Sequence, residues 1–340
     1  MPNTFYLHVG PPKTASTFLQ KTILPQIANI RCHIKPTVTF GDSEINFRDL
    51  FLFSPNLWKT FRKEPFAFLK DGTSKEQDVL VSDEGIYRRP ASPQPRLDLR
   101  QKKYGPIVKA NPKAGGRQDH TSFRSHLDAL REGARKQGFS QTKVLLTVRR
   151  QDEMLASLYA QLSRFVRGAS QENFERWALH LTNDRAGFYL GGGQKLSYYL
   201  WYESIVEALG ETNVLLLPFE LLRESTSGFL KRWLKFLGVE SAVSIANSLS
   251  DTRAKNRRSG SDLKWDISPP IRKLNLRPSR VFKAFGLPTS LPARWPDFQR
   301  DEEIRLTREL SQETLRSYEE ENRRLDNQGL DLNLKEYGYY

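Results

Sequence analysis

Short apolar runs alternate along the chain with segments whose apolar residues recur at helical spacing. Four runs are rich in β-branched or aromatic residues, as buried strands are: 5–9, 79–81, 143–148 and 213–217. A fifth run, 34–40, is interrupted by Pro36. Helical patterns cover 14–24, 123–137, 152–166, 196–209, 229–237 and 302–325. Strands that alternate with helices in this way predict a three-layer α/β/α fold with a central parallel sheet.

The segments between these elements differ in character. Residues 41–78 mix aromatic and charged side chains, which predicts helices and loops packed on the sheet. Residues 88–122 combine prolines, adjacent glycines and many basic residues. They predict a lid or insertion, because long loops in compact domains are usually functional or disordered. We expect one domain over 1–340, with a loop region at 250–300 and a C-terminal helix and tail at 301–340.

The first predicted strand runs directly into a loop that has the features of a phosphate site. Phe5–Val9 is followed by the turn Gly10–Pro12 and then by a helix from Thr14. Free N–H groups at the start of such a helix point at one spot, and the helix dipole favours an anion there. Lys13 adds a full positive charge. Hydroxyl donors are added by Ser16 and Thr17.

This loop is not a Walker A motif, which needs four residues between its first glycine and its Gly-Lys pair. Here only two prolines separate Gly10 from Lys13, a length that suits a 5′-phosphate carrying one more group. The stretch Gly-Pro-Pro-Lys-Thr-Ala-Ser-Thr-Phe-Leu resembles the 5′-phosphosulfate loop of sulfotransferases that use 3′-phosphoadenosine-5′-phosphosulfate (PAPS). The resemblance implies a P-loop fold related to nucleotide kinases, PAPS as donor and 3′,5′-adenosine bisphosphate (PAP) as product. It assigns donor binding to Gly10, Pro12, Lys13, Thr14, Ala15, Ser16 and Thr17.

A second anion site is expected because PAPS carries a 3′-phosphate that ATP lacks. Arg149 follows the run 143–148 directly, and Ser157 lies eight residues further on, inside a predicted helix. An arginine fork grips a phosphate bidentately, and a serine hydroxyl adds a donor. This arrangement resembles the 3′-phosphate site of sulfotransferases. The usual proline two residues after the arginine is replaced by Gln151, so the turn can differ, and Arg150 can share or take the role.

The candidate general base is Glu84, which follows the strand 79–81 within Ser-Asp-Glu-Gly. Sulfuryl transfer to an alcohol requires removal of the acceptor proton, which a carboxylate or histidine at a strand end can perform. Sulfotransferases that act on sugars often have a glutamate at this place. The resemblance therefore makes Glu84 the base and gives Lys13 the task of neutralising charge on the leaving phosphate. Asp83 and His120 are the alternative bases, and a capping role at a helix start remains open for Glu84 or Asp83.

A late basic segment, 253–260, lies where family members close a loop over the adenosine. The match is one of position, and it assigns Arg257 and Arg258 to cofactor binding. A solvated basic loop explains the same composition.

Composition narrows the class of partner without choosing one. The chain of 340 residues carries a net charge of +14, which suits a nucleotide, an acidic polysaccharide or nucleic acid. With the basic lid, the resemblance points to a hydroxyl acceptor on a saccharide or glycolipid and away from nucleic acid. A nucleotide or small-molecule kinase would need a Walker-type lysine loop, which is absent, and a magnesium-binding aspartate. A nucleic-acid-binding protein would be expected to show a recognised module or exposed aromatics among its basic residues, and neither is clear.

The same composition bears on metals and localisation. The five histidines (8, 33, 120, 126 and 180) have no ligand spacing, and Cys32 alone builds neither a zinc site nor an internal disulfide. We therefore expect no metal. No apolar run approaches the ~18 residues of a membrane span, and no secretory signal is visible. A cytoplasmic enzyme fits these observations.

Overall fold

The structure is a computed structural model that describes residues 3–40, 43–53, 55–58, 65–70, 77–88, 121–183, 196–240, 242–250, 263–269 and 300–340. The chain divides into two compact units. The sheet unit comprises the described residues within 1–90, 100–148 and 201–257, and the helical unit comprises those within 149–200 and 258–340. Three predicted features lie outside the described residues: most of the lid at 88–122, His120, and most of the loop region 250–300 with Arg257 and Arg258.

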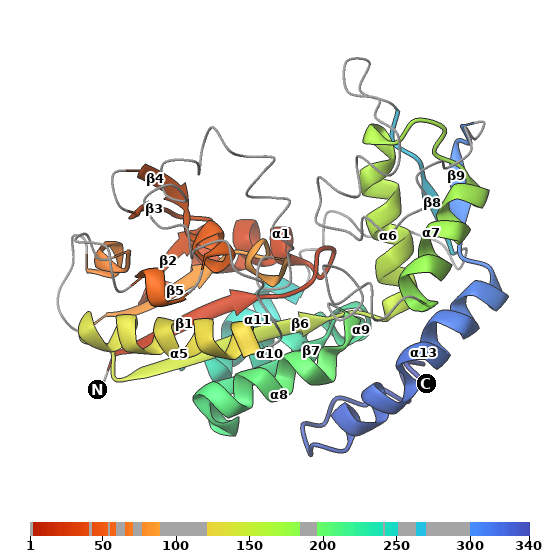
Figure 1. The fold of residues 1–340 in the computed structure, drawn as a ribbon. Helices are drawn as coiled ribbons and strands as arrows, with labels where there is room; N and C mark the ends of the chain where they lie inside the picture. Colours follow the sequence, from red (N-terminus) through yellow and green to blue (C-terminus); the bar gives the residue numbers. More distant parts are fainter. Residues whose placement is uncertain are drawn as a thin grey trace. The chain divides into compact units, whose positions relative to one another are not determined.

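The sheet unit is built on five parallel strands (Figure 1). Their spatial order is β2 (Ile30–Ile34), β5 (Asp78–Ser82), β1 (Thr4–Val9), β6 (Gln141–Val148) and β7 (Val214–Pro218). In the central register Leu7 pairs with Val81 on one side and with Val144 on the other. The predicted α/β fold with a central parallel sheet is therefore confirmed.

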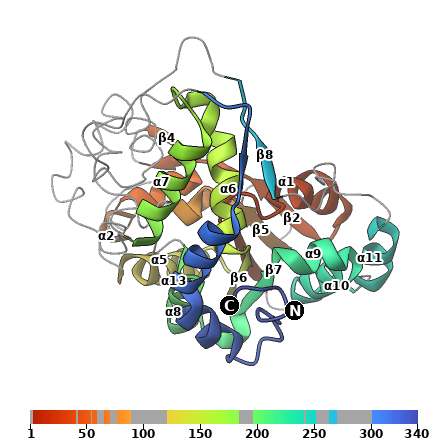
Figure 2. The ribbon, with the colours of Figure 1, turned by 90° about the vertical axis from the view of Figure 1, so that its right-hand side faces the viewer.

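Helices cover both faces of this sheet, which is why its strands are nearly continuous apolar runs. Side chains alternate between the faces along each strand. Tyr6, Leu80 and Leu145 pack with α9 (Phe219–Glu224), α10 (Thr226–Phe236) and α11 (Ala242–Ser250). On the other face lie α5 (Thr121–Lys136) and the part of α8 (Tyr198–Leu209) from residue 201 onward (Figures 1 and 2).

The helical unit packs three helices around an aromatic core. These are α6 (Gln151–Leu162), α7 (Gln171–Asn183) and α13 (Arg308–Asp326). A short antiparallel pair, β8 (Lys264–Asp266) and β9 (Glu303–Arg305), adds Trp265 and Ile304 to the core. The sequence reading did not identify α7, although Phe174, Trp177 and Leu181 recur at helical spacing and are buried.

Three predicted boundaries are wrong at the N-terminal end of the chain. The first helix begins at Ser16 rather than Thr14, as α1 (Ser16–Phe18), and continues through a π-helical turn (Leu19–Ile23) and a 3₁₀ turn (Leu24–Gln26). The helical segment ends at Gln26 rather than at residue 24, with Pro25 near its end. The predicted strand 34–40 is two strands of different sheets, because Pro36 lacks the N–H that a continuous ladder needs. They are β2 and β3 (Thr37–Phe40), the latter paired with β4 (Ser43–Asn46).

Two further boundaries differ near the ends of the helical unit. The predicted helix 302–325 begins only at Arg308, where the hydroxyl of Thr307 accepts a bond from the N–H of Leu310. The residues before it form β9. The helix predicted over 152–166 ends at Leu162 and passes into a 3₁₀ turn, Ser163–Phe165.

The remaining elements in the described part of the chain are short. One helix, α2, covers Pro55–Trp58, and 3₁₀ turns cover Phe47–Leu52, Ala67–Leu69, Ile86–Arg88 and Glu211–Asn213. Their aromatic side chains pack together, with Phe47 against Phe51 and Phe51 against Trp58. Among the helices described, none combines the length and apolar character needed to cross a membrane.

Candidate functional site

The loop that follows β1 has the backbone shape of an anion cradle. Lys13 and Ala15 have φ values of 70° and 61°, in the left-handed region that residues with side chains rarely adopt. Such turns create concavities in which successive N–H groups face an anion. The hydroxyl of Thr14 donates to the carbonyl of Pro11 at 2.8 Å, so this side chain stabilises the loop from within. Lys13 is exposed, so its charged side chain lies at the surface of the loop.

The helical segment after the loop supplies further donors. The first N–H groups of a helix have no intrahelical carbonyl to bond, and the helix dipole makes that end positive. The first intrahelical bond here runs from the N–H of Leu19 to the carbonyl of Ala15 at 3.0 Å. Ser16 is buried and Thr17 is exposed at this start. The residues of this loop that were predicted to bind the 5′-phosphosulfate therefore lie together at the carboxyl end of β1.

Gly10 lies so close to β6 that there is no room for a side chain at this position. A Cβ atom at this position would lie 2.8 Å from the carbonyl oxygen of Thr147, a backbone atom that cannot move alone. We expect Gly10→Ala to displace the loop and to lower the free energy of unfolding by about 1–3 kcal/mol, as overpacking does. Urea denaturation would measure this change. Ala15→Gly is the matched control, because glycine relieves the left-handed backbone there; a loss of stability in that variant would contradict the loop geometry.

Three neighbouring strands end at the same edge and bring Glu84 to this loop. Ser82 pairs in register with His8 on β1 and with Ile34 on β2. One Glu84 oxygen, Oε1, lies 2.6 Å from Nζ of Lys35, the residue after β2. The other, Oε2, accepts a bond from Nε2 of Gln20 at 3.2 Å. Because Gln20 belongs to the helical segment after the loop, the structure joins the candidate base to the candidate donor site.

The surroundings of Glu84 favour its ionised form. Burial opposes ionisation, but the hydrogen bond and charge of Lys35, together with the bond from Gln20, outweigh it and lower the pKa of Glu84. The carboxylate is therefore ionised at neutral pH, which is the state that can accept a proton.

Asp83, the alternative carboxylate, is turned into the structure. It is fully buried, its Oδ1 accepts a bond from the N–H of Gly85 at 2.8 Å, and Arg48 lies 3.5 Å from the same oxygen. Burial raises the pKa of Asp83. This carboxylate shapes the turn after β5. Glu84, in contrast, is partly exposed.

The sequence reading missed His8, Ser82 and Gln20, which connect the strand ends. Nδ1 of His8 lies 2.8 Å from Oγ of Ser82, which also accepts a bond from Nε2 of Gln20 at 3.0 Å. Burial lowers the pKa of His8 to about 4, so its ring is neutral at pH 7. The only sequence signal was a histidine in an apolar run next to the loop. Lys35 and Gln20 gave no signal, because their role depends on contacts across the sheet.

Arg149 and Ser157 belong to the helical unit, where the turn after β6 is held by ion pairs. Arg149 is buried, and its Nη2 lies 2.6 Å from Oε2 of Glu153. Arg150 lies 2.5 Å from Asp152. The two acidic residues in the first turn of α6 thus pair with the two arginines. Ser157 is half-buried on α6.

Gln151, which replaces the expected proline, anchors this turn through its side chain. Its Nε2 donates to the carbonyl of Leu196 at 3.2 Å and to Oδ1 of Asn322 at 2.9 Å. The hydroxyl of Tyr198 donates to the carbonyl of Arg149 at 2.5 Å. The Arg149 segment is therefore fixed by hydrogen bonds that a proline would not make.

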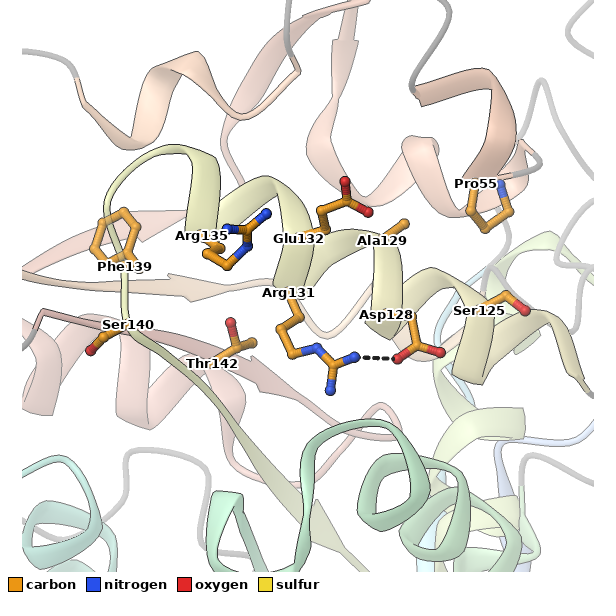
Figure 3. Close-up of a pocket in the computed structure, with 10 residues that line it drawn as sticks. All are labelled: Pro55, Ser125, Asp128, Ala129, Arg131, Glu132, Arg135, Phe139, Ser140 and Thr142. Atoms are coloured by element: carbon orange, nitrogen blue, oxygen red, sulfur yellow. Dashed lines mark hydrogen bonds and ion pairs between the residues drawn. The ribbon is translucent and has the colours of Figure 1, made fainter.

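A surface hollow of about 550 Å³ lies beside α5 and the start of β6 (Figure 3). Arg131 pairs there with Asp128 at 3.0 Å and also donates to the carbonyl of Ala208. The lining carries both signs of charge, since it also includes Glu132 and Arg135. The hollow adjoins the beginning of β6, whereas the loop lies at the carboxyl end of β1, so it forms no part of the candidate site.

Within the described ranges, no group of three or more histidine, cysteine, aspartate or glutamate side chains could hold a metal ion. Cys32 is half-buried on β2, and burial raises the pKa of its thiol to about 11.

Comparison with known proteins gives matches to solved structures alone. No protein-family model matches it, and no curated protein matches it significantly. A sulfotransferase from Alicyclobacillus acidocaldarius superimposes with a TM-score of 0.46 at 15% identity, covering 99% of this chain and 98% of that one. Mouse sulfotransferase SULT7A1, complexed with PAP, gives a TM-score of 0.43 at 15% identity, covering 99% and 88%. Both matches extend over nearly the full length of this chain at low sequence identity.

Proposed function

We propose that this protein is a sulfotransferase that moves the sulfuryl group of PAPS to an acceptor hydroxyl on a saccharide or glycolipid. The observation that carries the proposal is that an anion-binding loop and an ionised carboxylate meet at one edge of the sheet. The left-handed loop Gly10–Ala15 leads into a helical segment, and Gln20 of that segment binds the ionised carboxylate of Glu84. An anion cradle and a proton acceptor are the two groups that transfer to an alcohol requires.

The loop residues suit PAPS because they can bind its negatively charged groups. When bound, PAPS supplies the sulfuryl group, and PAP is left after transfer. Lys13 and the N–H groups at Ser16 and Thr17 would hold the 5′-phosphosulfate, and Lys13 would neutralise the charge that develops on the departing phosphate. Glu84 would take the proton from the acceptor hydroxyl as its oxygen bonds to sulfur.

The 3′-phosphate is assigned to Arg149 and Ser157. Arg149 lies in a turn fixed by Tyr198 and Gln151, and its guanidinium already binds one carboxylate. A fixed guanidinium that accepts a carboxylate also suits phosphate oxygens, which have the same bidentate geometry. Arg257 and Arg258 remain the proposed residues that cover the adenosine.

Calorimetry with PAP and AMP tests this function directly. PAP is expected to bind much more tightly than AMP, and transfer from PAPS to a panel of saccharide acceptors is expected to persist in EDTA. Equal affinities for the two nucleotides would remove the 3′-phosphate assignment. A strict magnesium requirement with ATP would support a kinase, and tight binding of an oligonucleotide in place of PAP would support a nucleic-acid-binding protein.

A further inference from the structure

Lys35, the residue after β2, has a backbone conformation that glycine and asparagine usually occupy. Its φ is 51°, in the left-handed region. Its N–H donates to the carbonyl of Ser82 at 3.0 Å, which ties the turn to the end of β5. A residue held in such a conformation by its surroundings is a reason to ask what its side chain does.

The side chain of Lys35 is one of two donors that grip Glu84. Nζ of Lys35 binds Oε1 at 2.6 Å, and Nε2 of Gln20 binds Oε2 at 3.2 Å. Each carboxylate oxygen thus has its own donor, and the donors come from opposite flanks of β5. Two donors on two oxygens restrict the rotation of the carboxylate.

Two other titratable groups lie near Glu84 among the residues that the structure describes, and neither supplies a positive charge. Asp83 is engaged by Gly85 and Arg48. His8 is wholly buried, and burial lowers its pKa to about 4, so it carries no charge at neutral pH. Within the described part of the chain, Glu84 forms an ion pair with Lys35, whose charge favours the anion.

We propose that Lys35 is a positioning residue that fixes the orientation of Glu84 and keeps it ionised for the acid–base step. The role in transfer rests on the proposed function, because it requires Glu84 to be the base. Lys35 need not touch the substrate for this role. Its absence should change both the acidity of Glu84 and the pH range of activity.

The direction of the change follows from the sign of the interaction. The positive charge of Lys35 lowers the pKa of Glu84, so its removal should raise that pKa. A general base works when deprotonated, so the acidic limb of the kcat/KM profile should move to higher pH. At plateau pH the loss of orientation should lower kcat by up to ~10²-fold.

The experiment compares Lys35→Gln, Lys35→Arg and the control Lys136→Gln. Lys136 forms an exposed pair with Glu132 on α5, so its change removes the same charge away from the site. The carboxyl of Glu84 is titrated by ¹³C NMR with labelled glutamate and assigned with Glu84→Gln, and the pH profile of transfer from PAPS is measured in parallel. Lys35→Gln should shift the titration and the profile upward, Lys35→Arg should restore most of both, and Lys136→Gln should change neither.

The outcomes separate this inference from the proposed function. An unchanged titration and acidic limb in Lys35→Gln would overturn the positioning role. A shifted titration in a protein that neither binds PAP nor transfers from PAPS would uphold the contact and reject the proposed function, and with it the catalytic role. If Lys35→Gln fails to fold, Lys35→Gly removes the same charge while suiting the left-handed backbone, and the same two readouts apply.

Discussion

Glu84→Gln is expected to lower kcat by ~10²–10⁴-fold while leaving the fold and PAP affinity intact, because removal of a general base has this effect. Glutamine keeps the size of the side chain and an oxygen that can accept from Gln20 or Lys35, so the strand ends should stay in place.

Lys13→Ala is expected to behave differently from Glu84→Gln. This variant should lose both PAP affinity and turnover. The same positive charge would bind the 5′-phosphate group and would also neutralise the negative charge that develops on it as the sulfuryl group is transferred. Steady-state kinetics, calorimetry with PAP and melting temperatures would distinguish the two variants.

Asp83→Asn is the matched control for Glu84→Gln. It makes the same chemical change one residue away, on a buried carboxylate that binds Gly85 and Arg48. It should lower the melting temperature and leave turnover within a few-fold. If Glu84→Gln instead keeps near-wild-type turnover, the base lies elsewhere. A large loss of turnover in Asp83→Asn would then point to Asp83, and His120 would be the next residue to vary.

Arg149→Met is expected to reduce PAP affinity to the level of AMP. A hydrogen bond to a charged group contributes about 1.5–3 kcal/mol, which corresponds to roughly 10–150-fold in Kd. The change also leaves Glu153 buried without this partner, and breaking a buried pair from one side costs about 3–5 kcal/mol of stability. The double variant Arg149→Met/Glu153→Leu should recover stability but not PAP affinity. Calorimetry and urea denaturation of both variants would separate the two effects.

Glu153→Gln provides the converse test of the same site. It removes the carboxylate that occupies Arg149, so PAP should bind at least as tightly as to the wild type and raise the melting temperature by more. AMP should show no such gain. Arg305→Met, at an exposed pair with Glu303, is the control for loss of an arginine charge. If PAP and AMP respond alike to Arg149→Met, Arg149 does not bind the 3′-phosphate.

Local pattern determined much of the fold and the position of the loop. Strands buried on both faces leave continuous apolar runs, so β1, β5, β6 and β7 were readable from the sequence. The loop after β1 was readable because Gly10, Lys13 and the following hydroxyls lie at fixed offsets along one stretch of chain. Residues adjacent in sequence need no tertiary information to be placed together.

The tertiary structure decided what local pattern leaves open. The polar residues of β2 concealed this strand in the sequence, and only its pairing with β5 shows that it is a strand. Packing on α6 and α7 defined β9, which the charge pattern assigned to a helix. Which carboxylate faces the loop was also decided across the sheet: Asp83 and Glu84 are equivalent in sequence, but Gly85 and Arg48 hold one while Lys35 and Gln20 hold the other. These partners are distant in sequence and meet only because parallel strands end at a common edge, so no local pattern could reveal them.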